Sequence, residues 1–232
     1  MPERKLGFVH RFLPGSETGP RMMLLLLHGT GGDEQDMLPL GRQLAPNADL
    51  LSPRGKVLEN GMPRFFRRFS EGVFDEEDIK LRAGELAEFV REASLAYGFH
   101  GNSVVGVGYS NGANIAAALH FLHPRVLVGS ALFRPMVPLV PDPLPDLSGV
   151  RVFVSSGLQD PVVPRRENER LVNLLRKTGA TVTVRWANAG HEIGEGETRP
   201  AREWLLSSFP RQRGTNTYPE KRSPSRSGTP AH

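Results

Sequence analysis

The 232-residue chain contains no cysteine. This absence excludes disulfide bonds, thiolate nucleophiles and metal sites held by cysteine. Long apolar runs are missing as well, because the strongest, "MMLLLL" at 22–27, is far shorter than the roughly 20 residues that span a bilayer. The first residues, "MPERKLGFVHRFLPG", lack the apolar core of a secretory signal. We therefore expect a cytoplasmic protein with no membrane partner.

Most of the chain also lacks a surplus of charge of either sign. The net charge of +4 is carried by residues 210–232, with five basic residues against one acidic residue, so residues 1–209 are neutral. The segment 210–232 is rich in Pro, Ser and Gly and poor in apolar residues, which predicts a disordered basic tail. We expect one folded domain at 1–209, whose neutrality gives no electrostatic reason to expect a nucleic-acid partner.

Short apolar runs alternate with stretches of helical period, a pattern typical of βαβ units and a mainly parallel sheet. The runs consist of Val and Leu without polar alternation, as in strands covered on both faces. Strands are expected at 22–29, 48–53, 103–108, 126–133, 150–157 and 180–186. Helices are expected over 79–97 with Gly98 as its cap, directly after Gly112, and between Pro164 and Gly179. The sequence thus predicts an α/β fold with helices on both faces of the sheet.

Two long segments, 53–78 and the proline-rich 134–149, show neither period and are expected to be irregular. Both follow predicted strands. In a parallel sheet they would lie at the carboxyl edge of the strands, where ligands bind in such folds.

The stretch "GVGYSNGAN" at 106–114 places Ser110 between a predicted strand and a predicted helix. Gly108 and Gly112 complete the pattern Gly-x-Ser-x-Gly, in which a sharp turn lifts a nucleophilic serine above the sheet edge. Glycine suits both positions because strand and helix pass closely there. The pattern alone is equally compatible with a purely structural turn.

A catalytic serine needs a histidine base and a carboxylate that orients it, in the chain order Ser, acid, His in this class of fold. Asp160 follows a predicted strand by a short loop, "SSGLQDPVVP". Asp142 and Asp146 lie inside the proline-rich segment, where aspartate commonly serves in turns. We therefore predict Asp160 as the acid.

His191 is the predicted base, because it follows a strand in the glycine-flanked loop "ANAGHEIG". His120 and His123 are on the helix after Ser110, where packing or exposure is favoured over metal binding, and His232 is in the tail. One helix and one strand fit between Asp160 and His191, so acid and base would emerge from neighbouring strand ends.

The oxyanion of an acyl-transfer intermediate needs two N–H donors. The backbone N–H groups of Asn111 and of Thr30, in the loop "LHGTGGDEQD", are the predicted donors. The alternative of a phosphate-binding glycine loop lacks the required lysine and glycine spacing. His28 is expected to brace this loop through hydrogen bonds.

At "LHGTGGDEQDMLPL", "GYSNGAN", "SGLQDPVVP" and "AGHEI" the sequence resembles the phospholipase/carboxylesterase family of α/β-hydrolases. The stretch "LSPRGKVLENGMPRFFRRFSEGVFDEEDI" is similar to the branch of bacterial hydroquinone-resistance esterases. The resemblance covers about residues 5–209 and implies an α/β-hydrolase fold. It further implies that Ser110, Asp160 and His191 form a catalytic triad, with Thr30 and Asn111 as the oxyanion hole. A body of about 209 residues leaves little room for a separate cap domain, and no metal or cofactor is expected.

The leading functional hypothesis is a serine esterase or thioesterase acting on small to medium apolar acyl groups of a small-molecule substrate. Met136, Val137 and Leu139 are candidate pocket walls, with plain loop packing equally favoured. In "PRFFRR", an arginine at 64, 67 or 68 could bind an anionic substrate group, but a solvated segment anchored by two phenylalanines is preferred. The alternatives are a non-catalytic binding module that uses the basic tail, and a peptidase. A homodimer is compatible with the sequence.

Overall fold

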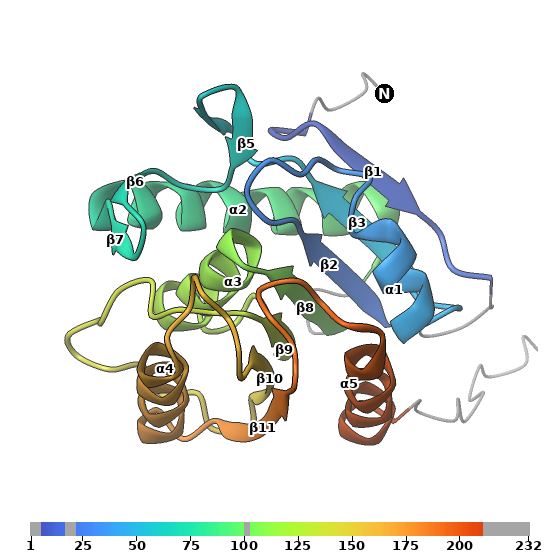
Figure 1. The fold of residues 1–232 in the computed structure, drawn as a ribbon. Helices are drawn as coiled ribbons and strands as arrows, with labels where there is room; N and C mark the ends of the chain where they lie inside the picture. Colours follow the sequence, from blue (N-terminus) through green and yellow to red (C-terminus); the bar gives the residue numbers. More distant parts are fainter. Residues whose placement is uncertain (1–5, 17–21, 100–102, 211–232) are drawn as a thin grey trace, which may run out of the picture.

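A seven-stranded sheet runs through the centre of the computed structural model, which describes residues 6–16, 22–99 and 103–210 (Figure 1). In spatial order the strands are β1 (His10–Leu13), β3 (Asp49–Pro53), β2 (Met23–Leu27), β8 (Val104–Tyr109), β9 (Gly129–Phe133), β10 (Arg151–Gly157) and β11 (Thr181–Ala187). β1 pairs antiparallel with β3, and every pair from β3 to β11 is parallel. The predicted mainly parallel sheet is confirmed.

Helices cover both faces of the sheet. One face carries α2 (Glu76–Tyr97), α3 (Asn111–Leu122) and α4 (Arg165–Lys177), and the other carries α1 (Leu38–Leu44) and α5 (Glu195–Ser208) (Figure 1). Each set of helices shares its own apolar cluster with the strands. All five residues of β2 are buried, which explains why its run of leucines shows no alternation.

The longest helix, α2, has a recognisable cap at each end. The side chain of Asp75 accepts a hydrogen bond from the backbone N–H of Asp78 at its start. Gly98 follows its end with a φ of 71°, in the left-handed conformation that glycine adopts without strain. The predicted role of Gly98 as a helix cap is confirmed.

The prediction of an irregular segment at 53–78 is wrong in part, because the segment contains two small hairpins. They are formed by β4 (Val57–Glu59) with β5 (Met62–Arg64), and by β6 (Arg68–Ser70) with β7 (Val73–Phe74). Strands of two or three residues are too short to show alternation in a sequence. The segment 134–149 contains no helix or strand, as predicted. The two segments leave the carboxyl ends of β3 and β9.

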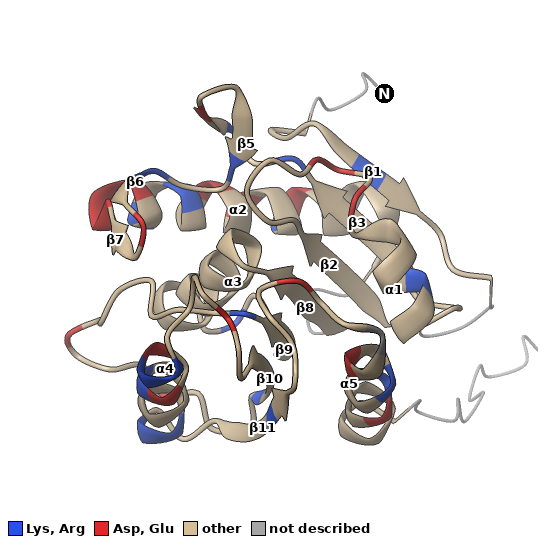
Figure 2. Cartoon of the chain, in the orientation of Figure 1, with Lys and Arg blue, Asp and Glu red and all other residues tan. Residues whose placement is uncertain are grey.

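Charged residues of both signs are interspersed along the outer helices. On α4 and α5, basic and acidic segments alternate in the view of Figure 2, while the visible central strands are largely free of charge. No helix in the described ranges is long and apolar enough to cross a membrane. Residues 211–232 lie outside the described residues, so the division into a domain at 1–209 and a disordered tail stays a prediction.

Candidate active site

Ser110 occupies a strained turn between β8 and α3. Its φ of 50° and ψ of −115° are unusual for a residue other than glycine. A Cβ atom at Gly108 would lie 2.5 Å from the carbonyl oxygen of Gly112, and one at Gly112 would lie 2.0 Å from that of Leu27. Both positions therefore require glycine, for the predicted reason that strand and helix pass closely. The turn projects the serine beyond the carboxyl end of β8.

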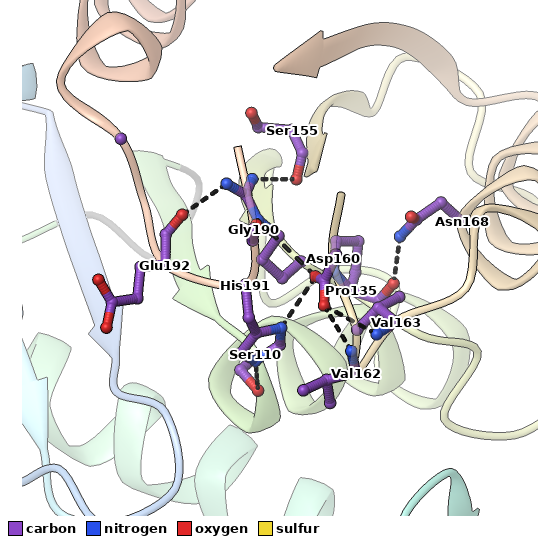
Figure 3. A network of polar contacts seen from close by, with 12 residues as sticks. Ser110, Pro135, Ser155, Asp160, Val162, Val163, Asn168, Gly190, His191 and Glu192 are labelled. Carbon is purple, nitrogen blue, oxygen red and sulfur yellow. Dashed lines mark hydrogen bonds and ion pairs between the residues drawn. The ribbon is translucent and has the colours of Figure 1, made fainter. Parts of the chain in front are cut away.

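Three side chains from different strand ends form one hydrogen-bonded chain (Figure 3). The Ser110 hydroxyl donates to His191 Nε2 at 3.0 Å, and His191 Nδ1–H donates to Asp160 Oδ2 at 2.9 Å. A carboxylate only accepts hydrogen bonds, so its contact with Nδ1 fixes the tautomer that leaves Nε2 free to accept. The structure thus brings together the three residues that the sequence singled out, in the arrangement that activates a serine.

Two backbone N–H groups hold the Asp160 carboxylate in place. Its Oδ1 atom accepts hydrogen bonds from the backbone N–H groups of Val162 at 2.8 Å and Val163 at 3.0 Å. The side chain is only 1% exposed, which keeps water from competing with His191 for the carboxylate. By contrast, Asp146 accepts a hydrogen bond from the backbone N–H of Ser148 in its own loop, as expected of a turn residue.

The loop after β2 lies against the first turn of α3. Thr30 and Asn111 are bridged by consecutive residues, since Arg64 Nη1 donates to Thr30 Oγ1 at 2.7 Å and the Phe65 N–H donates to Asn111 Oδ1 at 2.7 Å. Within the described part of the chain, neither backbone N–H of the predicted pair donates to another group. Their role as donors to a bound oxyanion stays a prediction.

His28 braces the Thr30 loop, as the sequence predicted. Its Nε2 atom accepts a hydrogen bond from the Gly55 N–H at 2.9 Å, so its Nδ1–H donates to the Gly29 carbonyl, at 2.6 Å. Burial lowers the pKa of His28, which keeps the imidazole neutral and in this tautomer.

The basic stretch after β5 differs in part from the solvated segment that was expected. Phe65 and Phe66 are buried anchors, as predicted. Arg67 and Arg68 form ion pairs with Asp75 and with Glu59. The side chain of Arg64, in contrast, is only 2% exposed, because the charge is matched by Glu59 and by the Thr30 hydroxyl.

The three predicted pocket residues are all buried. Val137 and Leu139 belong to the core cluster on the α2–α4 face, and that packing accounts for them. Met136 lies beside the β6–β7 hairpin, with Sδ 4.0 Å from the position a Cβ atom would take at Gly72. Contact of these residues with a substrate stays a prediction.

Arg134 is a residue near the site that the sequence did not single out. Its guanidinium is 3.8 Å from Asp160 Oδ2, and the side chain is fully buried. The signal that could have revealed it is an arginine directly after the continuous apolar strand "VGSALF". His120 is also buried, and its Nε2 atom contacts the Ser130 hydroxyl. Among the described residues, no three His, Asp or Glu side chains converge as a metal site requires.

The sheet topology, with Ser110, Asp160 and His191 following β8, β10 and β11 in this chain order, is that of an α/β hydrolase. Residues 15–207 match the family described as Phospholipase/Carboxylesterase, and the chain belongs to this family. The putative hydrolase MhqD of Bacillus subtilis (strain 168) is 52% identical over 187 residues, which are 81% of this chain and 94% of MhqD.

Two solved structures extend the comparison. The Bacillus cereus carboxylesterase is 48% identical with a TM-score of 0.85, over 88% of this chain and 96% of that chain. A carboxylesterase from Mesorhizobium loti is 35% identical with a TM-score of 0.82, over 88% of this chain and 96% of that chain. The predicted family and the α/β-hydrolase fold are confirmed, and the protein is a hydrolase of the esterase type.

Proposed function

We propose that this protein is a metal-independent serine carboxylesterase or thioesterase that works through Ser110, His191 and Asp160. The observation that carries the proposal is the hydrogen-bonded chain from Ser110 through His191 to Asp160, mounted on a strained strand–helix turn. A turn that served structure alone would need neither the strained serine nor a histidine ring nitrogen aimed at its hydroxyl.

The reaction follows from this geometry. His191 Nε2 takes the hydroxyl proton as Ser110 Oγ attacks the acyl carbon, and the N–H groups of Thr30 and Asn111 hold the oxyanion. His191 then gives the proton to the leaving alcohol or thiol, and an acyl-enzyme remains. A water molecule, deprotonated by His191, attacks the acyl carbon, and Ser110 recovers the proton as the acid leaves. Asp160 orients the imidazole and balances its charge throughout.

The segments around the site favour small or medium apolar acyl groups. The two hairpins carry exposed apolar side chains, among them Leu58, Met62 and Phe69, beside the carboxyl edge of the sheet. Met62 lies next to Gly31, the neighbour of Thr30, with Sδ 3.7 Å from the position of a Cβ atom there. An apolar acyl chain bound near the oxyanion hole would contact these side chains.

Replacement of triad members tests the proposal. In Ser110→Ala, kcat for p-nitrophenyl acetate should fall by up to about 10⁶, and labelling by a fluorophosphonate probe should vanish. In Asp160→Asn, kcat should fall by about 10⁴, because the amide favours the wrong imidazole tautomer. Asp146→Asn is the matched control and should retain full activity.

Three results would contradict the proposal. Folded wild-type protein that the probe does not label would favour the binding-module hypothesis. Greater damage from Asp146→Asn than from Asp160→Asn would identify another acid. Activity lost on treatment with EDTA and restored by zinc would contradict a metal-independent mechanism. Parallel assays with p-nitroanilides distinguish an esterase from a peptidase.

A further inference from the structure

Arg134, the residue that follows β9, is buried although its side chain carries a charge. The side chain has no exposed area, and the backbone φ of 56° is left-handed, which is unusual outside glycine. Residues in strained conformations persist where the surrounding structure requires them. The contacts of the guanidinium show which parts of the structure hold it in this conformation.

Each of the five guanidinium N–H groups has an acceptor. Nε donates to the Gly190 carbonyl at 2.8 Å, and one Nη2 hydrogen bond reaches the Glu192 carbonyl at 2.6 Å. Nη1 donates to the Ser155 carbonyl at 3.3 Å. The remaining two hydrogen bonds join Nη1 and Nη2 to the two carboxylate oxygens of Glu197, both at 2.6 Å. Figure 3 labels three of these partners: Ser155, Gly190 and Glu192.

The two loop carbonyls flank His191 in the sequence. Gly190 precedes the histidine and Glu192 follows it, so the arginine binds the backbone on both sides of the predicted base. The same guanidinium lies 3.8 Å from Asp160 Oδ2, the atom that accepts from His191. Arg134 therefore contacts the backbone that carries the base and faces the acid that orients it.

Glu197 links this cluster to helix α5. Its Oε1 atom accepts from the Gly194 N–H at 2.8 Å in the first turn of the helix, and Oε2 accepts from the Ser155 hydroxyl. Burial opposes ionisation of Glu197, but the hydrogen bonds from Arg134, Ser155 and Gly194 outweigh it and hold its pKa below the ordinary value. The ionised carboxylate matches the arginine charge and fixes the guanidinium in place.

We propose that Arg134, held by Glu197, is a positioning residue that sets the backbone of the His191 loop so that Nε2 meets the Ser110 hydroxyl. The inference rests on the proposed function of the triad. This positioning role requires the forked geometry of a guanidinium, because one side chain must bind acceptors on β10, on the His191 loop and on α5 at the same time. A lysine could match the Glu197 charge but could not reach both loop carbonyls in the same plane.

The test compares variants by kcat and KM for p-nitrophenyl acetate. Arg134→Met combined with Glu197→Gln removes the two buried charges together, because either charge alone would be left unpaired in the interior. Arg134→Lys retains the charge and removes the fork. Rates are taken per active site titrated with a fluorophosphonate, so that any unfolded fraction does not count.

A matched control is Arg42→Met. The Arg42 guanidinium also donates to backbone carbonyls, those of Leu13, Pro14, Pro46 and Ala48, but none belongs to the candidate site. Its loss should lower the thermal midpoint and leave kcat unchanged. This control separates the effect of losing a structural arginine from the effect of a displaced base.

We expect kcat to fall about 10- to 100-fold in both Arg134 variants with KM within about twofold, because a small displacement of the base slows proton transfer without changing ester binding. A kcat within threefold of wild type in either folded variant would overturn the inference. If the double variant fails to fold, the kcat of Arg134→Lys alone tests the inference. Ser110→Ala is measured beside them: full activity there would refute the triad itself, whereas inactive Ser110→Ala with normal Arg134 variants would refute only this inference.

Discussion

Ser110 and Arg134 have backbone φ angles of 50° and 56°, where side chains other than glycine are strained. They leave the carboxyl ends of the adjacent strands β8 and β9, and the Ser110 N–H donates to the carbonyl of Phe133 at 2.9 Å. Each such residue costs about 1–3 kcal/mol of folding free energy. The two strained positions are those of the proposed nucleophile and of the arginine that binds the backbone on both sides of the proposed base.

At the scale of single residues, the burial of His120 predicts how the stability of the protein depends on pH. Burial lowers its pKa from 6.5 to about 4, and its Nδ1 atom has no hydrogen-bond partner among the residues that the structure describes. The unfolded chain binds a proton at higher pH than the folded one, so this residue makes the protein less stable as the pH falls from about 6.5 to about 4. The loss should reach about 3 kcal/mol in free energy of unfolding.

His120→Gln is the variant that checks this prediction. Glutamine places an amide near Nε2 of the imidazole and can keep the contact with Ser130, but it does not titrate. Urea unfolding at pH 7, 6, 5 and 4 should show that wild type loses more stability than the variant. The buried carboxylates are common to both proteins and cancel in the difference. If the free energies of unfolding of wild type and variant fell in parallel with pH, the prediction would be wrong, because His120 would then bind a proton as readily in the folded state as in the unfolded state.

At the scale of elements, the approach of α3 to the end of β2 determines how the two predicted oxyanion donors, Thr30 and Asn111, lie relative to each other. A Cβ atom at Gly112 would lie 2.0 Å from the Leu27 carbonyl oxygen and 2.5 Å from that of His28, and backbone atoms cannot move aside cheaply. The same contact keeps the Thr30 loop beside the first turn of α3. The absence of a side chain at Gly112 therefore allows α3 to lie this close to the end of β2.

Gly112→Ala should separate these elements and reduce kcat/KM at least about 100-fold, since the oxyanion donors would move apart. Overpacking of this kind typically costs about 1–3 kcal/mol of stability. Gly84→Ala in α2 is the matched control, because its nearest neighbour would be His123 Nε2 at 3.9 Å. It should keep full activity and gain up to about 1 kcal/mol from better helix propensity. Wild-type kcat/KM in folded Gly112→Ala would contradict the argument.

On the scale of the whole molecule, the parallel sheet gathers distant parts of the chain at one edge. Ser110, Asp160 and His191 follow β8, β10 and β11, and the loop that carries Thr30 follows β2. The two segments that leave β3 and β9 border the same edge, so the proposed catalytic groups and their surroundings share one end of the fold. Helix α5 is followed by Phe209, whose ring packs edge-on against Trp204 at 5.7 Å between centroids.

A chain that ends at Phe209 tests the division of the molecule. Residues 210–232 carry the whole net charge and no predicted catalytic group. The shortened protein should keep kcat/KM for p-nitrophenyl acetate within about threefold, a difference of roughly 0.6 kcal/mol in activation free energy. Its salt-sensitive adsorption to a polyanion column should disappear. A large loss of turnover at an unchanged thermal midpoint would mean that the tail serves the active site.

The sequence alone determined six of the seven strands of the sheet, all but β1, and the strand–turn–helix around Ser110, and it singled out Asp160, which contacts His191 in the structure. These are local properties: apolar runs, glycine pairs and short loops show where a strand ends and which polar residue follows it. The alternation of strands and helices was enough to predict a parallel sheet, and a parallel sheet gathers such strand ends at one edge. The catalytic role of the gathered residues remains the proposal to be tested.

Only the tertiary structure decided what surrounds those residues. The hairpins β4–β5 and β6–β7 are too short to show a period, and their position depends on partners elsewhere in the fold. Arg64 and Arg134 look like surface residues in the sequence, since arginine is rarely buried without a partner. Their partners, Glu59 and Glu197, are identified only when the chain is folded, and Glu197 lies 63 residues from Arg134. Burial of a charge is a property of the contacts around it, and those contacts are made by residues distant in sequence.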